Sequence, residues 1–134
     1  MKHTIRILTF LLLCFGAQSL SAKSSTVLDL TQQNFTQTIH GKQPVLVKFW
    51  APWCRPCREM SPRFAHVSKS FVGKVLFAEL NVDEQKQIAA TYQVHSIPTT
   101  ILFINGKEMD RFTGGLSREQ IAYWAGEIVK GRYK

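Results

Sequence analysis

The sequence has little cysteine, few acidic residues and no long apolar run, and each shortage excludes a class of protein. Only 3 of its 134 residues are cysteine, too few for a small scaffold held by several disulfides. No apolar run reaches the roughly 20 residues that a membrane-spanning helix needs. Repeats, low-complexity segments and linkers are missing too. We therefore expect one soluble domain of ordinary size.

The acidic residues number 9 against 17 lysines and arginines, which gives a formal net charge of +8. The basic residues are scattered from Lys23 to Lys134 and form no stripe with interleaved aromatic residues. Nucleic-acid-binding proteins gather such residues on one face. The pattern therefore predicts a solvated basic surface and no nucleic-acid partner.

The N-terminal segment has the layout of a secretory signal peptide. Lys2 and Arg6 precede the apolar stretch 7–15, and the small and polar stretch 16–22 follows. We predict cleavage after Ala22, with cleavage one or three residues earlier as the alternatives. The organisation expected is a signal peptide at 1–22 and a domain at 23–134, exported to a bacterial periplasm.

Patterns typical of strands alternate with patterns typical of helices along the rest of the chain. Strands are predicted at 26–30, 44–50, 74–82, 100–104 and 108–113, and helices at 31–40, 54–70, 83–92 and 117–130. This order favours an α/β protein, a three-layer α/β/α sandwich around a mixed central sheet.

Turn and cap residues place the element boundaries. Thr31 and Asp83 are predicted to cap the first and third helices, and Ser117 to open the last with a capping box. Asn105-Gly106 predicts a hairpin turn, and Pro62 predicts a kink in the second helix.

Cys54 and Cys57 carry the clearest chemical signal, because Cys14 would leave with the signal peptide. They lie where a buried strand is followed by a helix. A helix N-terminus favours a thiolate at Cys54, and Cys57 is close enough to close a disulfide with it. Arg55 adds positive charge beside the nucleophile, and Pro56 stiffens the turn.

Other uses of the cysteine pair are less well supported. A zinc site needs four ligands and no second cysteine pair exists. Haem attachment needs histidine where Arg58 stands. A copper or zinc carrier, and a binding module with idle cysteines, remain as alternatives to an enzyme. His95 is interpreted as a surface residue.

The chain resembles the thioredoxin family from about residue 26 to residue 130. The resemblance is carried by Trp-Cys-Arg-Pro-Cys at 53–57, Ile-Pro-Thr at 97–99, Pro62, and the glycines at 106 and 114. It implies a monomeric oxidoreductase that exchanges a dithiol for a disulfide on protein or peptide substrates. Cys54 would attack, Cys57 would resolve the mixed disulfide, and no cofactor beyond this redox-active disulfide is expected.

The resemblance also implies a docking surface. The Ile97–Pro98 bond would be cis and lie against the cysteines, and Ile97 would pair with an extended substrate segment. Trp53, Pro56, Ile97 and Gly114 would form the apolar rim.

The direction of exchange has competing indications. Ile97 before Pro98 and the absence of an inserted helical module resemble reductants. Arg55 and Lys48 favour the alternative, a thiol oxidant, because stabilising the thiolate stabilises the reduced form. We favour a disulfide reductase, which in an exported protein needs a membrane-embedded redox relay as electron donor.

Two charges depart from the family pattern. Lys48 stands where the resemblance leads one to expect a buried aspartate, and Glu79 where a lysine is expected. A lone charge in a buried strand is costly, so the two side chains are predicted to pair. The hypothesis is that Glu79, or a transiently neutral Lys48, assists proton transfer at Cys57.

Overall fold

The structure, a computed structural model, describes residues 25–134. The predicted signal peptide and its cleavage site lie outside these residues. The strands are β1 (Val27–Asp29), β2 (Val45–Trp50), β3 (Leu76–Asn81), β4 (Thr99–Ile104) and β5 (Lys107–Thr113). The helices are α1 (Phe35–Ile39), α2 (Arg55–Ser68), α3 (Lys86–Thr91) and α4 (Arg118–Val129), with a short 3₁₀ helix at Lys69–Phe71.

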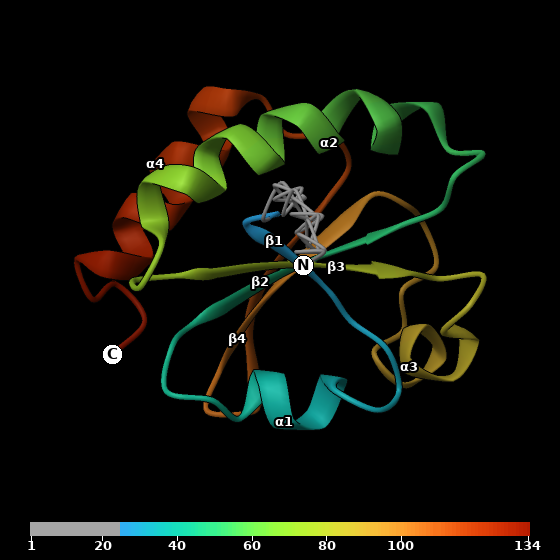
Figure 1. The fold of residues 1–134 in the computed structure, drawn as a ribbon, viewed down its shortest axis with the longest axis horizontal. Helices are drawn as coiled ribbons and strands as arrows, with labels where there is room; N and C mark the ends of the chain where they lie inside the picture. The colour runs from blue at the N-terminus through green and yellow to red at the C-terminus, as the bar shows by residue number, and fades with distance from the viewer. Residues whose placement is uncertain (1–24) are drawn as a thin grey trace, which may run out of the picture.

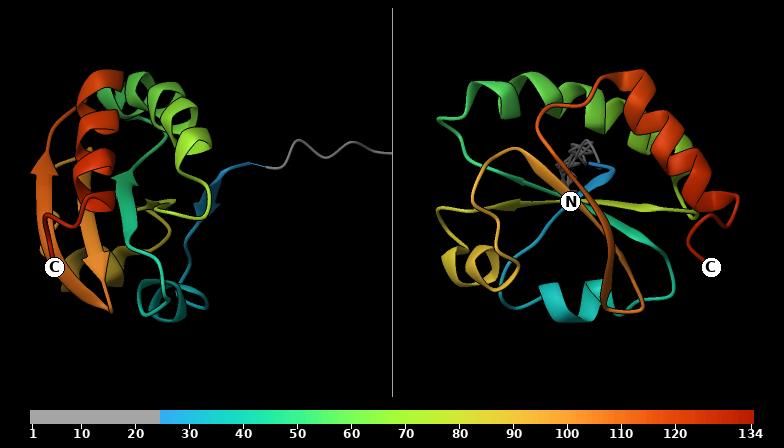
Figure 2. Two further views of the ribbon diagram at one scale, coloured as in Figure 1. Left: turned by 90° about the vertical axis from the view of Figure 1, so that its left-hand side faces the viewer. Right: turned by 180° about the vertical axis from the view of Figure 1, so that it is seen from behind.

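The five strands form one mixed sheet in the order β1-β3-β2-β4-β5. β1, β3 and β2 run parallel, and β4 and β5 are antiparallel to their neighbours. Helices α2 and α4 cover one face and α1 and α3 the other (Figures 1 and 2). The expected three-layer α/β/α sandwich is confirmed. None of the helices in residues 25–134 is long and apolar enough to cross a membrane.

β2 lies in the middle of the sheet and carries residues into both cores. Val45, Val47 and Phe49 are fully buried in the cluster that packs on α1 and α3. Successive side chains of a strand alternate between faces, so Leu46 and Lys48 face α2 and α4. A lysine is therefore built into an apolar layer, directly beside the helix that carries Cys57.

The predicted cap at Thr31 is wrong. α1 begins at Phe35, and Asn34 occupies its N-cap position. The Asn34 side-chain oxygen accepts the N–H of Thr31 instead, at 2.8 Å. Asparagine and threonine favour turns as well as caps, and here they make a turn that precedes the helix.

The predicted cap at Asp83 is wrong for a similar reason. α3 begins at Lys86, with Gln85 at its N-cap. Asn81 at the end of β3 accepts the N–H of Asp83 at 2.9 Å and forms a turn before the helix. This turn leaves the Asp83 carboxylate free to reach the active site.

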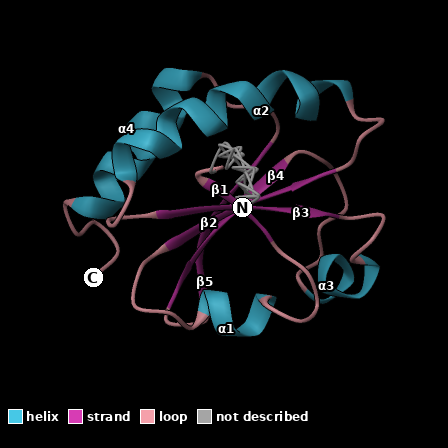
Figure 3. Cartoon of the chain, viewed as in Figure 1, coloured by secondary structure: helices cyan, strands magenta, loops and turns pink. Residues whose placement is uncertain are grey.

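The capping box and the hairpin turn are confirmed, and the kink at Pro62 stays a prediction; Figure 3 shows the helices and strands that these residues bound. Ser117 and Gln120 form the capping box of α4. Asn105 and Gly106 have positive φ values of 52° and 78°, as a tight hairpin turn between β4 and β5 requires. Pro62 lies inside α2 and does not end it.

Candidate active site

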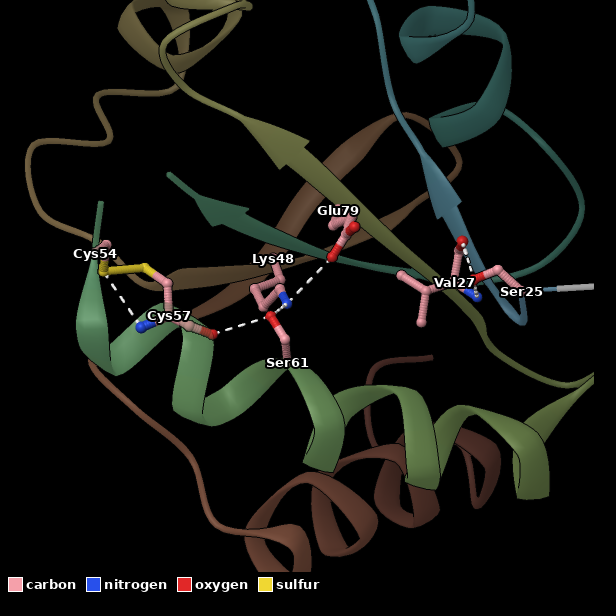
Figure 4. A network of polar contacts seen from close by, with 7 residues as sticks. All are labelled: Ser25, Val27, Lys48, Cys54, Cys57, Ser61 and Glu79. Carbon is pink, nitrogen blue, oxygen red and sulfur yellow. Dashed lines mark hydrogen bonds and ion pairs between the residues drawn. A yellow bond between two sulfur atoms is a disulfide. The ribbon is translucent and has the colours of Figure 1, made fainter. Parts of the chain in front are cut away.

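Cys54 and Cys57 form a disulfide where β2 is followed by α2, with their Cα atoms 5.3 Å apart (Figure 4). Cys54 is the N-cap residue of α2 and has extended backbone angles. Its sulfur accepts the N–H of Cys57 at 3.3 Å. The free N–H groups and partial positive charge of the helix N-terminus therefore face this sulfur.

The two cysteines differ slightly in their exposure to solvent. Cys54 is 5% exposed and Cys57 is fully buried. Both pack against Ala51, Trp50 and Ile97. A substrate disulfide can reach Cys54 first, whereas Cys57 is reached from within the protein.

The loop before β4 lies against the disulfide. The Ile97–Pro98 bond is cis, and the Ile97 carbonyl oxygen lies 3.7 Å from the Cys54 sulfur. Gly114, with φ +112°, donates its N–H to the Pro98 carbonyl at 2.8 Å. The structure thus brings Ile97 to the cysteine pair, and it joins Gly114 to Pro98, the residue after Ile97.

Trp53 is 68% exposed beside the disulfide, and Pro56 is exposed on the first turn of α2. The Trp53 indole N–H donates to the Asp83 carboxylate at 2.8 Å. An exposed indole would otherwise rotate freely, so this bond holds one edge of the rim in place. Sequence reasoning missed Asp83, because a cap signal and a free carboxylate look alike in sequence.

The Arg55 side chain lies in solvent and contacts Glu59. Its side chain is 82% exposed and its Nε donates to Glu59 at 3.1 Å, one turn along α2. A surface pair of this kind leaves a screened charge. The effect of Arg55 on the Cys54 thiolate stays a prediction.

Lys48 and Glu79 pair as predicted. The Lys48 Nζ atom lies 3.2 Å from a Glu79 carboxylate oxygen, and the two residues are direct neighbours in the β2–β3 register. Burial lowers the pKa of Lys48 from its ordinary value of 10.5, and the Glu79 carboxylate offsets part of this effect. The swapped pair is therefore a real contact across the sheet.

Ser61 joins this pair to the active site, and sequence reasoning missed it. Its hydroxyl accepts from Lys48 Nζ at 2.6 Å and donates to the Cys57 carbonyl at 3.0 Å (Figure 4). The signal available was a serine four residues after Cys57, which a helix places on the same face. Only the packing of α2 on β2 shows that this face meets Lys48.

Two buried polar atoms beside Lys48 have no hydrogen-bond partner among residues 25–134. They are the indole nitrogen of Trp50, two residues along β2, and the hydroxyl of Thr100, opposite Lys48 on β4. Such orphaned groups are rare in a folded protein. This side of the sheet is unusually polar for a layer between a sheet and helices.

Within residues 25–134, no three histidine, cysteine, aspartate or glutamate side chains come together as a metal site would need. His95 is exposed, in the loop before the cis peptide bond. The chemistry that the described residues bring together is that of two sulfurs at a helix N-terminus.

Comparisons with known proteins agree with this geometry. The thioredoxin family model matches residues 26–127. The thioredoxin of Alicyclobacillus acidocaldarius subsp. acidocaldarius is 39% identical over 103 residues, covering 77% of this chain and 98% of that protein. That of Buchnera aphidicola subsp. Acyrthosiphon pisum is 35% identical over 104 residues, covering 77% of this chain and 96% of that protein.

A chloroplast relative matches a smaller share of its own length. Thioredoxin M4 of Arabidopsis thaliana is 38% identical over 106 residues, which cover 78% of this chain and 55% of that protein. The match to the family model and the Cys54–Cys57 pair support one conclusion. The chain belongs to the thioredoxin family, and it is a thiol–disulfide oxidoreductase.

Proposed function

We propose that this protein is an exported disulfide reductase that acts on protein or peptide disulfides. The Cys54 thiolate attacks one sulfur of the substrate disulfide, and the other leaves with the electron pair as a thiolate. The Cys57 thiolate then attacks the Cys54 sulfur in the mixed disulfide. The Cys54–Cys57 bond forms, the second substrate thiolate leaves, and the substrate has gained two electrons.

The observation that supports this assignment of roles is the difference between the two cysteines in position and exposure. Cys54 is at the helix N-cap and is the more exposed of the two, while Cys57 is fully buried. Attack on a bulky substrate needs access, whereas resolution needs only proximity to Cys54. Cys54 therefore serves as the nucleophile and Cys57 as the resolving thiol.

Substrates dock on the rim defined by Trp53, Pro56, Ile97 and Gly114. The Ile97 carbonyl beside the Cys54 sulfur is placed to pair with an extended backbone. Backbone pairing is insensitive to the substrate's side chains, so this rim suits a range of partners.

The reducing direction is supported by the similarity to thioredoxins over almost the whole described domain. Export is supported by the signal-peptide pattern of residues 1–22, which precede the matched region. The protein acts as a monomer in the periplasm and receives electrons from a membrane-embedded relay. It uses no cofactor besides its own disulfide.

An insulin-reduction assay with dithiothreitol as electron source tests the activity. The purified protein should accelerate reduction, the Cys54→Ser variant should lose the effect, and Cys57→Ser should accumulate mixed disulfides. Turnover that survives Cys54→Ser, or no turnover in the wild-type protein, would leave a binding module or a metal carrier as the function.

Direction is tested by the equilibrium of the Cys54–Cys57 pair with glutathione. A potential near that of reducing thioredoxins, about −270 mV, supports the reductase, and one near about −120 mV supports an oxidant. Mass spectrometry of the native protein tests export, because cleavage after Ala22 fixes the N-terminal mass.

A further inference from the structure

Lys48 is the charged side chain most completely enclosed in the described domain, at 1% side-chain exposure. Its ammonium lies 5.3 Å from the centre of the Phe64 ring and 5.9 Å from that of Trp50. Aromatic faces attract a cation, but they replace little of the water that burial removes. A charge kept in this place has either a structural or a chemical use.

The polar contacts of Lys48 lead in two directions. On β3 its partner is Glu79, whose side chain is 27% exposed and so partly screened by solvent. On α2 its partner is Ser61, which in turn bonds to the Cys57 carbonyl. Cys57 is fully buried, so the field of the ammonium reaches it through protein and not through water.

The groups that face Lys48 are few. Glu79 on β3 is the carboxylate, Ser61 on α2 is neutral, and Thr100 on β4 is a buried hydroxyl without a partner among residues 25–134. Trp50, its neighbour on β2, is also neutral. Glu79 is the one countercharge that faces Lys48 among residues 25–134. It is partly exposed and lies on the β3 side, away from α2, so the net field toward α2 is positive.

We propose that the Lys48 ammonium, anchored by Ser61 and Glu79, stabilises negative charge on the Cys57 sulfur during thiol–disulfide exchange. Lys48 is thus a positioning residue, acting on the sulfur through its charge. The inference rests on the proposed exchange at Cys54 and Cys57, and it adds how the potential of that pair is set.

The effect operates in both half-reactions. When Cys57 resolves a mixed disulfide, its thiol first gives its proton to solvent, and the ammonium stabilises the thiolate that attacks Cys54. When a donor dithiol attacks the Cys54 sulfur, the Cys54–Cys57 bond breaks and Cys57 leaves with the electron pair. A more stable leaving thiolate speeds this step, and the disulfide accepts electrons more readily.

The test is the redox equilibrium of the Cys54–Cys57 pair with glutathione, measured for the wild-type protein and for Lys48→Met. Methionine has a side chain of similar length to lysine but carries no charge. An opposite charge close to a thiolate shifts its protonation equilibrium by on the order of tenfold. Measured at a pH at which Cys57 is ionised in both reduced proteins, the Lys48→Met equilibrium should therefore shift toward the disulfide by on the order of tenfold, or about 30 mV. The pH at which the Cys57 thiolate forms, followed by its ultraviolet absorbance, should rise.

Matched variants separate charge from packing. Lys48→Arg keeps the charge and should stay close to the wild-type equilibrium, and Ser61→Ala should give a smaller shift in the same direction as Lys48→Met. Thr100→Val changes a buried hydroxyl beside Lys48 without changing charge, and it should leave the equilibrium as in wild type. If Lys48→Met does not fold, the double variant Lys48→Met/Glu79→Gln removes the pair together and should show the same shift.

Wild-type values in a folded Lys48→Met or double variant, for both the equilibrium and the thiolate titration, would overturn the inference. An equal shift in Thr100→Val would do the same, because packing would then be the cause. Insulin turnover is a separate measurement. If the wild-type protein did not reduce insulin, the proposed function would fail, whereas the glutathione equilibrium would still test the effect of Lys48 on the cysteine pair.

Discussion

Replacing Glu79 by glutamine should destabilise the protein more than replacing Lys48 by methionine. Glu79→Gln leaves an ammonium at 1% exposure without its countercharge. Lys48→Met leaves a carboxylate that is 27% exposed and can turn toward water. The two variants should differ in stability because only Lys48 is fully buried. If the pair were an ordinary surface salt bridge, both substitutions would have small and equal effects.

The magnitude follows from the geometry. Opposite charges 3.2 Å apart interact by about 5 kcal/mol at an effective dielectric constant of about 20. The partial exposure of Glu79 reduces this figure, and release of the Lys48 proton limits the loss. We expect Glu79→Gln to cost about 2–4 kcal/mol of unfolding free energy at neutral pH. Lys48→Met should change it by about 1 kcal/mol or less, because methionine fills the apolar slot.

The lowered pKa of Lys48 also makes the stability depend on pH. The folded pKa of Lys48 lies below 10.5, so between the two values the unfolded chain binds more protons than the folded one. Stability contributed by this residue therefore rises with pH across that window and is lost as pH falls through the folded pKa. Glu79→Gln lowers the folded pKa further, so its deficit against wild type should narrow as the pH approaches 10.5.

Urea unfolding of the oxidised wild-type protein and both variants, at neutral pH and at about pH 9, measures the loss of unfolding free energy in each variant and how the Glu79→Gln loss changes with pH. Equal losses for the two variants, or a Glu79→Gln deficit that does not change with pH, would refute the reasoning. The first result would mean that Glu79 is as buried in energetic terms as Lys48. The second would mean that the protonation of Lys48 in the folded proteins does not change between these two pH values.

Other substitutions test the rim and the turns. Asp83→Ala frees the Trp53 indole and should raise KM for insulin several-fold while leaving the reduction of a small disulfide unchanged; steady-state kinetics on both substrates decide it. Gly106→Ala should cost about 2 kcal/mol and Gly73→Ala about 1 kcal/mol in chemical denaturation. Both glycines have positive φ, so both substitutions strain the backbone. A Cβ at position 106 would also collide with the His40 ring, whereas a Cβ at position 73 would have no atom within 4 Å. Equal losses of unfolding free energy in the two variants would contradict this clash.

The layers of the fold could be predicted because hydrophobic period and chain order determine them. The apolar run 44–50 predicted a strand buried on both faces, and β2 is the central strand. The pairing of Lys48 with Glu79 could be predicted as well, because each charge was isolated in a buried strand. An isolated buried charge needs a partner, and the other strand offered one.

The cap residues and Ser61 could not be predicted for different reasons. Thr31 and Asp83 have side chains that serve caps and turns about equally well, so local sequence leaves the choice to neighbours such as Asn34 and Asn81. Ser61 is on a helix face whose facing strand is fixed only by tertiary packing. Its role depends on Lys48, 13 residues earlier, and no short motif records such a contact.

The structure separates the residues that bind substrate from those that set the potential. Trp53 and Asp83 lie together at the exposed rim. Lys48 and Ser61 lie between the sheet and α2. Among residues 25–134, no hydrogen bond joins Lys48 or Ser61 to a residue of the rim. Asp83→Ala should therefore raise KM with the glutathione equilibrium unchanged. Lys48→Met should shift that equilibrium with KM for insulin unchanged. Parallel changes of KM and equilibrium in either variant would show that rim and buried pair act as one unit, and the division of roles would fail.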